Sequence, residues 1–322
     1  MKPIEISFAG YKGPASIHAT AARAFGAALQ RSLGDRVRFD LEPDIIARGH
    51  KSGDLLPMTA SGELTCCYIA SIRFSKIIPE LQAFELPFLF ANREQIYRAL
   101  DGGLGAVLKQ KMQAQTPYRV LAIWDNGVRH ITNSIRPIRT PKDCQGLRIR
   151  IQLSEFLEKA FRALGFEPCA MDIKEFLDRL AAHEVDAQEN PLGVIRDFKF
   201  QDHHKYLTLS GHIIGLVLVL CNAEIFDAWP DDVKRAVLQA AEEATRLHRG
   251  LARAEDEAVL AELDNGKTEI IHLTAAERKA FAAATAPLIE AYRQQIGPEI
   301  FSRYFPDEDV SSARPGLISG QD

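Results

Sequence analysis

Apolar and polar residues repeat with two different periods along the first half of the chain. Short segments that are apolar at alternate positions, or apolar throughout, predict strands, and longer segments with a period of about 3.6 residues predict helices. The predicted strands are 4–9, 37–41, 64–70, 118–125 and 147–152. The predicted helices are 16–33, 55–61, 154–164 and 173–182. This alternation of strands and helices is typical of an α/β fold with a parallel sheet.

Two longer helices are predicted in the last third of the chain. Residues 231–263 contain no proline and a single glycine, and a continuous helix over them would be about 50 Å long at ~1.5 Å per residue. A helix of that length suits a chain in which it connects two domains. The second helix is predicted to begin at the capping box of Thr274 and Glu277 and to run through Tyr292.

The chain shows no internal repeat and no low-complexity linker, so we expect two α/β domains joined by several crossings of the chain. The first domain would comprise residues 1–126 and about 215–252. The second would comprise residues 127–214 and about 253–310, and residues 311–322 would form a flexible tail.

Composition excludes several classes of protein. With 46% hydrophobic and 25% charged residues, the 322-residue chain has the composition of a soluble globular protein. Its longest apolar stretch, residues 213–221, is shorter than the roughly 20 residues that span a bilayer. A net charge of −4 gives no basic footprint for nucleic acid. The five cysteines include no C-x-x-C pair, so neither a disulfide framework nor a zinc site is predicted.

The first residues of the sequence contain no recognisable signal peptide. The chain passes from Met1 directly into the predicted strand at Ile4, without an apolar h-region or a cleavage site. Two interpretations stay open: a cytoplasmic protein, or the mature part of an exported protein to which a start methionine has been restored.

Arginines beside strand ends are the most informative polar residues. No H-E-x-x-H, Walker loop or G-x-S-x-G motif is present. Arg148 and Arg150 lie two apart on one predicted strand, so both point to the same face. Cations on a buried strand are costly unless they meet an anion, which is either a ligand or a protein carboxylate such as Glu189. We expect a protein carboxylate for Arg148 and a ligand for Arg150.

Four motifs, in this order, resemble the DctP-type solute-binding proteins of TRAP (tripartite ATP-independent periplasmic) transporters. They are GVRHITNSIRPIRTP at 127–141, GLRIRIQ at 146–152, AQENP at 187–191 and KYLTLSGH at 205–212. The resemblance implies a two-domain fold of the periplasmic-binding-protein type (type II-like) with a long domain-spanning helix. It implies a cleft between the domains that closes on a small organic acid, which is then passed to the permease subunits in the membrane. It also implies a periplasmic monomer that is not an enzyme. No cofactor, protein metal site or nucleic-acid partner is expected, and whether a metal ion assists binding of the ligand stays open.

The resemblance also assigns site residues. The family's carboxylate-binding arginine corresponds to Arg150, whose planar guanidinium can hold a carboxylate through two parallel hydrogen bonds that a lysine cannot reproduce. Arg129 corresponds to a second pocket arginine of some members, and Asn190 to a pocket amide. Glu189 is expected to orient an arginine. The other expected ligand contacts are Gln152 at the end of the Arg150 strand, and Tyr11, Tyr68, Ser71 and Arg73 from the N-terminal domain.

Trp124 is interpreted either as a stacking surface for the ligand or as a core residue. Ser52 and Ala70 stand where sialate-binding relatives carry acidic pocket residues, which argues against a large amino-sugar acid. A smaller monocarboxylate or dicarboxylate is expected instead. Two other functions stay open: a cytoplasmic hydrolase or lyase that uses Glu189 or His130 as a base, and a cytosolic sensor with the same fold.

Overall fold

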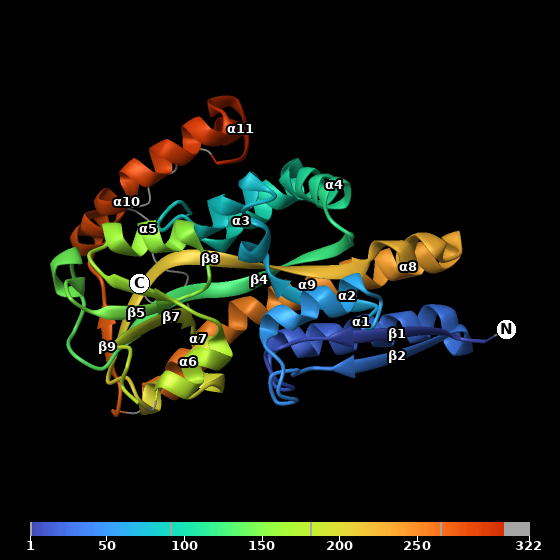
Figure 1. Cartoon of the computed structure of the whole chain (residues 1–322), viewed down its shortest axis with the longest axis horizontal. Helices are drawn as coiled ribbons and strands as arrows, with labels where there is room; N and C mark the ends of the chain where they lie inside the picture. The colour runs from blue at the N-terminus through green and yellow to red at the C-terminus, as the bar shows by residue number, and fades with distance from the viewer. Residues whose placement is uncertain (1, 91, 181, 265, 306–322) are drawn as a thin grey trace, which may run out of the picture. The chain divides into compact units, whose positions relative to one another are not determined.

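The computed structural model describes residues 2–90, 92–180, 182–264 and 266–305, so the expected tail at 311–322 lies outside the described residues (Figure 1). The chain divides into two compact units. Unit 1 comprises Met1–Ser71, Val107–Asp125 and Leu216–Glu255, and unit 2 comprises Ile72–Ala106, Asn126–Gly215 and Asp256–Asp322. Among the described residues, no helix is both long and apolar enough to cross a membrane.

The units differ from the expected division mainly in one segment, Ile72–Ala106, which was expected in the first domain and belongs to unit 2. Its contacts give the reason. The backbone N–H of Phe88 donates to the carbonyl of His212 (2.6 Å), and Arg93 forms an ion pair with Asp256 (Nη1–Oδ2, 2.8 Å). Further along, the chain passes from one unit to the other at 125/126, 215/216 and 255/256. These points were expected at 126/127, 214/215 and 252/253.

Among the described residues, unit 1 contributes five neighbouring strands to a nine-stranded sheet, in the order β2-β1-β3-β8-β4. Its strands are β1 (Ile4–Ala9), β2 (Val37–Glu42), β3 (Cys66–Ala70), the start of β4 (Tyr118–Asn133) and the end of β8 (Tyr206–Asn222). Its helices are α1 (Ile17–Leu33), α2 (Leu55–Ala60), α4 (Gly105–Gln115), α8 (Ala223–Ala228) and most of α9 (Asp231–Leu263). The predicted limits of α1 and α9 are confirmed, and Ser16 caps α1 by accepting from the Ala19 N–H (3.2 Å).

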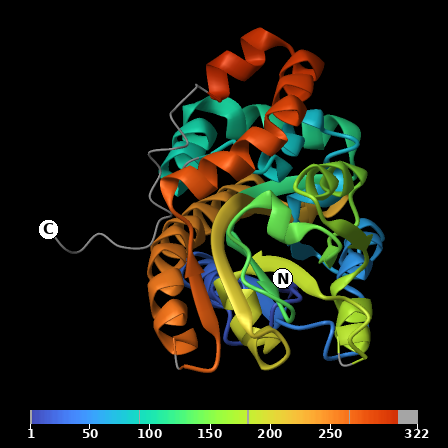
Figure 2. The same cartoon turned by 90° about the vertical axis from the view of Figure 1, so that its left-hand side faces the viewer.

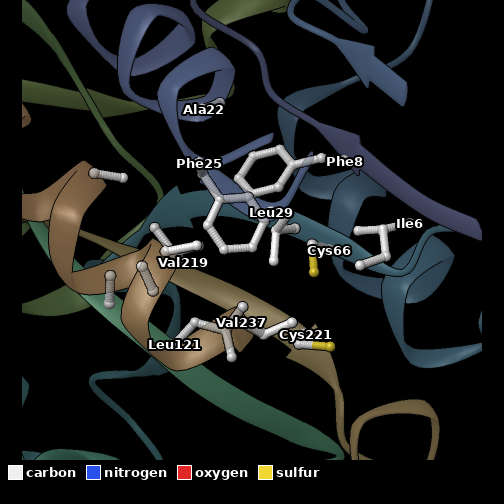
Figure 3. Packing of buried hydrophobic residues seen from close by; sticks show 14 of the residues in the cluster. Ile6, Phe8, Ala22, Phe25, Leu29, Cys66, Leu121, Val219, Cys221 and Val237 are labelled. Carbon is white, nitrogen blue, oxygen red and sulfur yellow. The ribbon is translucent and has the colours of Figure 1, made fainter. Parts of the chain in front are cut away.

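The core of unit 1 lies between the sheet and the helices α1 and α9. Figure 3 shows the rings of Phe8 from β1 and Phe25 from α1 together with Val219 from β8 and Val237 from α9. The two ring centroids are 5.9 Å apart and both side chains are fully buried. Burying such a side chain stabilises the fold by roughly 1.5–3 kcal/mol. The apolar residues that repeat along these strands and helices therefore determine which of their faces pack together.

Unit 2 has a mixed sheet. Its remaining strands are β5 (Arg148–Ile151), β6 (Glu167–Ala170), β7 (Ala187–Pro191) and β9 (Glu269–His272). Its helices are α3 (Arg93–Ala99), α5 (Glu155–Ala163), α6 (Ile173–Leu180), α7 (Leu192–Asp197), α10 (Ala275–Ile296) and α11 (Pro298–Tyr304). The strand β7 pairs parallel with β5 and antiparallel with β4, and β9 runs parallel beside β8 (Figure 2).

The α/β fold is confirmed, and its sheet is mixed rather than parallel throughout. The strand β3 pairs antiparallel with β8, as β7 does with β4, because β4 and β8 are long strands that each pass from one unit into the other. The capping box at the start of α10 is confirmed: Thr274 accepts from the Glu277 N–H (3.2 Å), and Glu277 accepts from the Thr274 N–H (2.7 Å).

Candidate functional site

Arg150 is a buried cation in the middle of unit 2. It lies on β5 between Cys169 of β6 and Gln188 of β7, and only 3% of the residue is exposed. Its Nε and Nη2 donate to the carbonyl oxygen of Met171 (3.2 and 2.9 Å), and its guanidinium lies 5.6 Å from the ring centroid of Phe176. Burial lowers the pKa of Arg150 to about 10, so the side chain is still charged at neutral pH.

No carboxylate pairs with Arg150 in the part of the chain that the structure describes. Its protein acceptor is one neutral carbonyl group, which does not balance a full positive charge. Desolvation of an unpaired guanidinium is costly, so the geometry suits an arginine that is completed by an anionic ligand.

Arg129 differs from Arg150 because the protein already supplies its counter-charge. It lies on β4 and donates from Nε and Nη2 to the two carboxylate oxygens of Glu189, the second contact being 2.7 Å. Its Nη2 also donates to Asn190 Oδ1 (3.1 Å). Burial alone would raise the pKa of Glu189, but Arg129 and the hydrogen bond from His212 offset it and hold the pKa at about 2. Glu189 therefore has the geometry expected of a carboxylate that orients an arginine.

Arg73 is also matched by a carboxylate. Its Nη2 lies 2.9 Å from Asp172 Oδ2, directly before α6, and Asp172 Oδ1 accepts from the Lys174 N–H (3.1 Å). Arg73 was expected from the N-terminal domain, whereas the structure places it in unit 2 together with Asp172. The reason is that the chain passes into unit 2 immediately after β3.

A chain of buried amides and hydroxyls continues from Arg129. Asn190 Nδ2 donates to Gln188 Oε1 (2.6 Å), and Gln188 Nε2 donates to Thr132 Oγ1 (2.6 Å), which is 2.8 Å from His204 Nδ1. Burial lowers the pKa of His204 to about 3, so the imidazole is neutral. Sequence reasoning missed Gln188, Thr132 and His204. The sequence signal for Gln188 and Thr132 was that polar residues recur two positions apart within the segments that form β7 and β4, which places them on one face of each strand.

Arg148 and Gln152 lie at the two ends of the Arg150 strand. Arg148 is paired with a protein carboxylate as expected, although the partner is Asp186 rather than Glu189. Both contacts, Nε–Oδ2 and Nη2–Oδ1, are 3.0 Å, and 44% of the Arg148 side chain is exposed. Gln152, which follows β5, is half-buried.

The candidates of unit 1 lie in and beside its core. Tyr68 on β3 is fully buried, and its hydroxyl accepts from the Lys12 N–H (3.2 Å). Burial raises the pKa of Tyr68, which therefore keeps its proton. The ring of Tyr11 is half-buried, 5.6 Å from that of Tyr68, and Ser71 is buried just after β3.

Trp124 is a core residue of unit 1. Its Nε1 donates to Thr245 Oγ1 on α9 (3.1 Å), and its ring stacks on His248 with 5.1 Å between centroids. With only 1% of the residue exposed, Trp124 presents no stacking surface within this unit.

The alternative base, His130, is enclosed in unit 2. It is fully buried, and its Nδ1 accepts from the Gly211 N–H (3.1 Å). Burial, together with the charges of Arg278 and Arg93, holds the pKa of His130 well below its usual range. Within the described ranges, no group of three or more His, Cys, Asp or Glu residues could hold a metal ion.

Comparisons with known proteins agree on one family. Residues 8–295 match the model of "DctP: Bacterial extracellular solute-binding protein, family 7". The 2,3-diketo-L-gulonate-binding periplasmic protein YiaO of Escherichia coli is 30% identical over 82% of this chain and 79% of its own. A TRAP periplasmic solute-binding protein of Sulfurospirillum deleyianum, solved with bound succinate, is 27% identical with a TM-score of 0.87, covering 98% of this chain and 100% of that one.

A further solved structure is similar to the same degree. The sugar acid binding protein DctPAm of Advenella mimigardefordensis, in complex with galactonate, is 27% identical with a TM-score of 0.88 and covers 97% of this chain and 98% of that one. These relatives are binding components of transporters and not enzymes, and they share the two-domain α/β fold. The chain belongs to the DctP family of bacterial extracellular solute-binding proteins.

Proposed function

We propose that this protein binds a small organic acid outside the cytoplasm and delivers it to the permease of a TRAP transporter, with Arg150 as the anchor of the ligand's carboxylate. One observation carries the proposal. Among the described residues that act electrostatically on Arg150, Arg129 and Arg73 each pair with a carboxylate, whereas Arg150 itself, buried in unit 2, pairs with none. The named ligands of the three relatives, 2,3-diketo-L-gulonate, succinate and galactonate, are all carboxylates.

The side chain of Arg150 is prepared for this role. Because Nε and Nη2 donate to Met171 and the guanidinium plane is held over Phe176, its orientation is set before a ligand arrives. The edge formed by Nη1 and Nη2 retains donors for the two oxygens of a carboxylate. Each charge-assisted hydrogen bond contributes about 1.5–3 kcal/mol, a good part of the roughly −8 kcal/mol of a micromolar affinity.

The other candidate residues have different roles in this proposal. Glu189 balances the charge of Arg129 and orients it, so in this proposal Arg129 adds hydrogen-bond donors rather than a second unmatched charge, and Asn190 holds Arg129 through its Oδ1. Gln152, Arg73, Tyr11, Tyr68 and Ser71 stay proposed ligand contacts. Trp124 acts through the core of unit 1 rather than by touching the ligand.

A thermal-shift screen with organic acids, sugar acids and amino acids tests the proposal. At about 100 times Kd, a ligand adds roughly 2.7 kcal/mol of stability and raises Tm by several degrees. We expect shifts with carboxylates, and clearly smaller shifts at the same ligand concentration when Arg150 is replaced by lysine. Shifts from neutral or cationic compounds, with none from acids, would contradict the anchoring role.

Transport by TRAP permease subunits, a periplasmic location and a monomeric state belong to the same proposal. The family and relatives described as periplasmic support the first two, and the monomeric state is a prediction from the resemblance. Closure of the two domains on the ligand stays a prediction. Small-angle scattering with and without the ligand tests it, because closure reduces the radius of gyration, and an unchanged radius would contradict it.

A further inference from the structure

The charges around Arg150 do not cancel. Two other arginines and two carboxylates of unit 2 act electrostatically on Arg150: Glu189, Arg129, Asp172 and Arg73. Glu189 pairs with Arg129 and Asp172 with Arg73. Since Arg150 itself donates only to the neutral Met171 carbonyl among the described residues, these five side chains carry one positive charge in excess.

The nearby imidazole does not alter this balance. His212 lies 3.4 Å from Glu189 Oε2 and is fully buried. Burial outweighs the attraction of Glu189 and lowers the pKa of His212 below its ordinary value. His212 is therefore uncharged at neutral pH, and the excess remains that of one guanidinium.

From this balance we infer that the ligand is an acid with a single negative charge, and that the site discriminates against a second carboxylate. This inference rests on the proposed function, because it requires the ligand's carboxylate to meet Arg150. One carboxylate neutralises the one unmatched arginine. A second carboxylate held in the same desolvated environment would find both other arginines already paired, and would be repelled by Glu189 and Asp172.

The sequence left both classes of acid open, and the relatives include both. Galactonate has one carboxylate and succinate has two, and each is the ligand of a relative that is 27% identical to this chain. Family membership therefore does not decide between them. In this inference the two ion pairs of unit 2 decide, because they set how much of the positive charge of these five side chains is left for the ligand.

Matched pairs of acids test the inference on the complete, unmodified protein. In each pair the two compounds differ at the last carbon alone, which is a hydroxymethyl group in one and a carboxylate in the other. Suitable pairs are hydroxybutyrate (with the hydroxyl on the terminal carbon) and succinate, erythronate and meso-tartrate, and galactonate and galactarate. Calorimetric titration near neutral pH is expected to give the monocarboxylate at least tenfold tighter binding in every pair that binds. Equal or tighter binding of the dicarboxylates would overturn the inference.

A variant that changes the charge balance tests whether this balance causes the discrimination against a second carboxylate. Asp172→Asn releases Arg73 from its counter-ion and adds one positive charge, while asparagine still caps the start of α6. We expect the affinity for each dicarboxylate, relative to its monocarboxylate partner, to rise at least fivefold. The matched control is Asp186→Asn, which releases the exposed Arg148 and should leave the ratio unchanged. An unchanged ratio in Asp172→Asn would show that the charge balance does not select the ligand.

These outcomes separate the inference from the proposed function. If dicarboxylates bind best and Arg150→Lys weakens their binding at least tenfold, the single-charge inference fails and the proposed function stands. If no acid of either class binds, or if Arg150→Lys binds as well as the unmodified protein, both fail. The comparison of acid pairs on the unmodified protein does not depend on the folding of any variant.

Discussion

Replacing Glu189 by glutamine removes the charge that neutralises Arg129 while keeping the size of the side chain. In the folded protein, Arg129 is buried and donates to both oxygens of this carboxylate. The variant leaves the guanidinium with the Glu189 backbone carbonyl and Asn190 Oδ1 as its remaining acceptors. A buried cation is then left without its counter-ion.

The magnitude follows from the pKa of Glu189. A pKa of about 2 in place of the ordinary 4.5 corresponds to about 3 kcal/mol of stability at neutral pH, at ~1.36 kcal/mol per unit. Breaking a buried ion pair by removing one partner costs a similar 3–5 kcal/mol or so. We therefore expect Glu189→Gln to lower the free energy of unfolding by about 3–5 kcal/mol.

Urea unfolding followed by circular dichroism measures this loss. Because the pKa of Glu189 is lowered, its contribution is complete above about pH 4.5 and is lost as the pH falls towards about 2. The difference in the free energy of unfolding between the unmodified protein and Glu189→Gln should therefore be constant near neutral pH and become smaller below pH ~4.5. Glu243→Gln is the control: it breaks the exposed Arg31–Glu243 pair and should cost less than about 1 kcal/mol. Two results would contradict a stabilising role of the Arg129–Glu189 pair: a loss of less than about 1 kcal/mol in the free energy of unfolding of Glu189→Gln, or a difference between the two proteins that grows in acid.

Two further predictions concern the stability of unit 2. Burial raises the pKa of Glu85 to about 8, although Ser154 donates a hydrogen bond to its Oε2 (2.8 Å). The contribution of Glu85 to the free energy of unfolding should therefore fall by about 1.4 kcal/mol per pH unit as the pH rises from about 4.5 to about 8. Glu85→Gln should remove this dependence in urea unfolding at a series of pH values, and an unchanged pH profile would contradict it. Gly127→Ala should lose at least about 2 kcal/mol, because Gly127 has a φ of 92° and an added Cβ would lie 2.5 Å from Pro191 Cβ. Gly250→Ala, where nothing lies near an added Cβ, is its control and should not destabilise α9; equal losses in the two variants would contradict the steric argument.

Local features of the fold were predictable from sequence because they depend on neighbouring residues. The caps formed by Ser16 and Thr274, and the length of α9, follow from hydrogen bonds and periodicity within a few residues. The strand β7 was not recognised, since its sequence AQENP is polar like a loop. Its polar side chains are stabilised by partners on β4, such as Arg129, and that pairing brings together residues far apart in the chain.

The site was predictable in part. Periodicity placed Arg148 and Arg150 on one strand, but their partners lie in other segments: Asp186 for Arg148 and the Met171 carbonyl for Arg150. The role of Arg150 came from the resemblance to a family, not from its spacing. Spacing also gave no sign that Arg73 would pair with Asp172, because that contact depends on how the chain enters unit 2.

Calorimetric titration of the unmodified protein and of Arg150→Lys, with an acid found by the thermal-shift screen, tests the central claim most directly. A lysine keeps the charge but cannot donate to Met171 and to a carboxylate in the planar geometry of a guanidinium. The account predicts at least tenfold weaker binding, with the Tm of the ligand-free variant within a few degrees of the original. Equal affinity in the two proteins would contradict the claim that Arg150 holds the ligand's carboxylate.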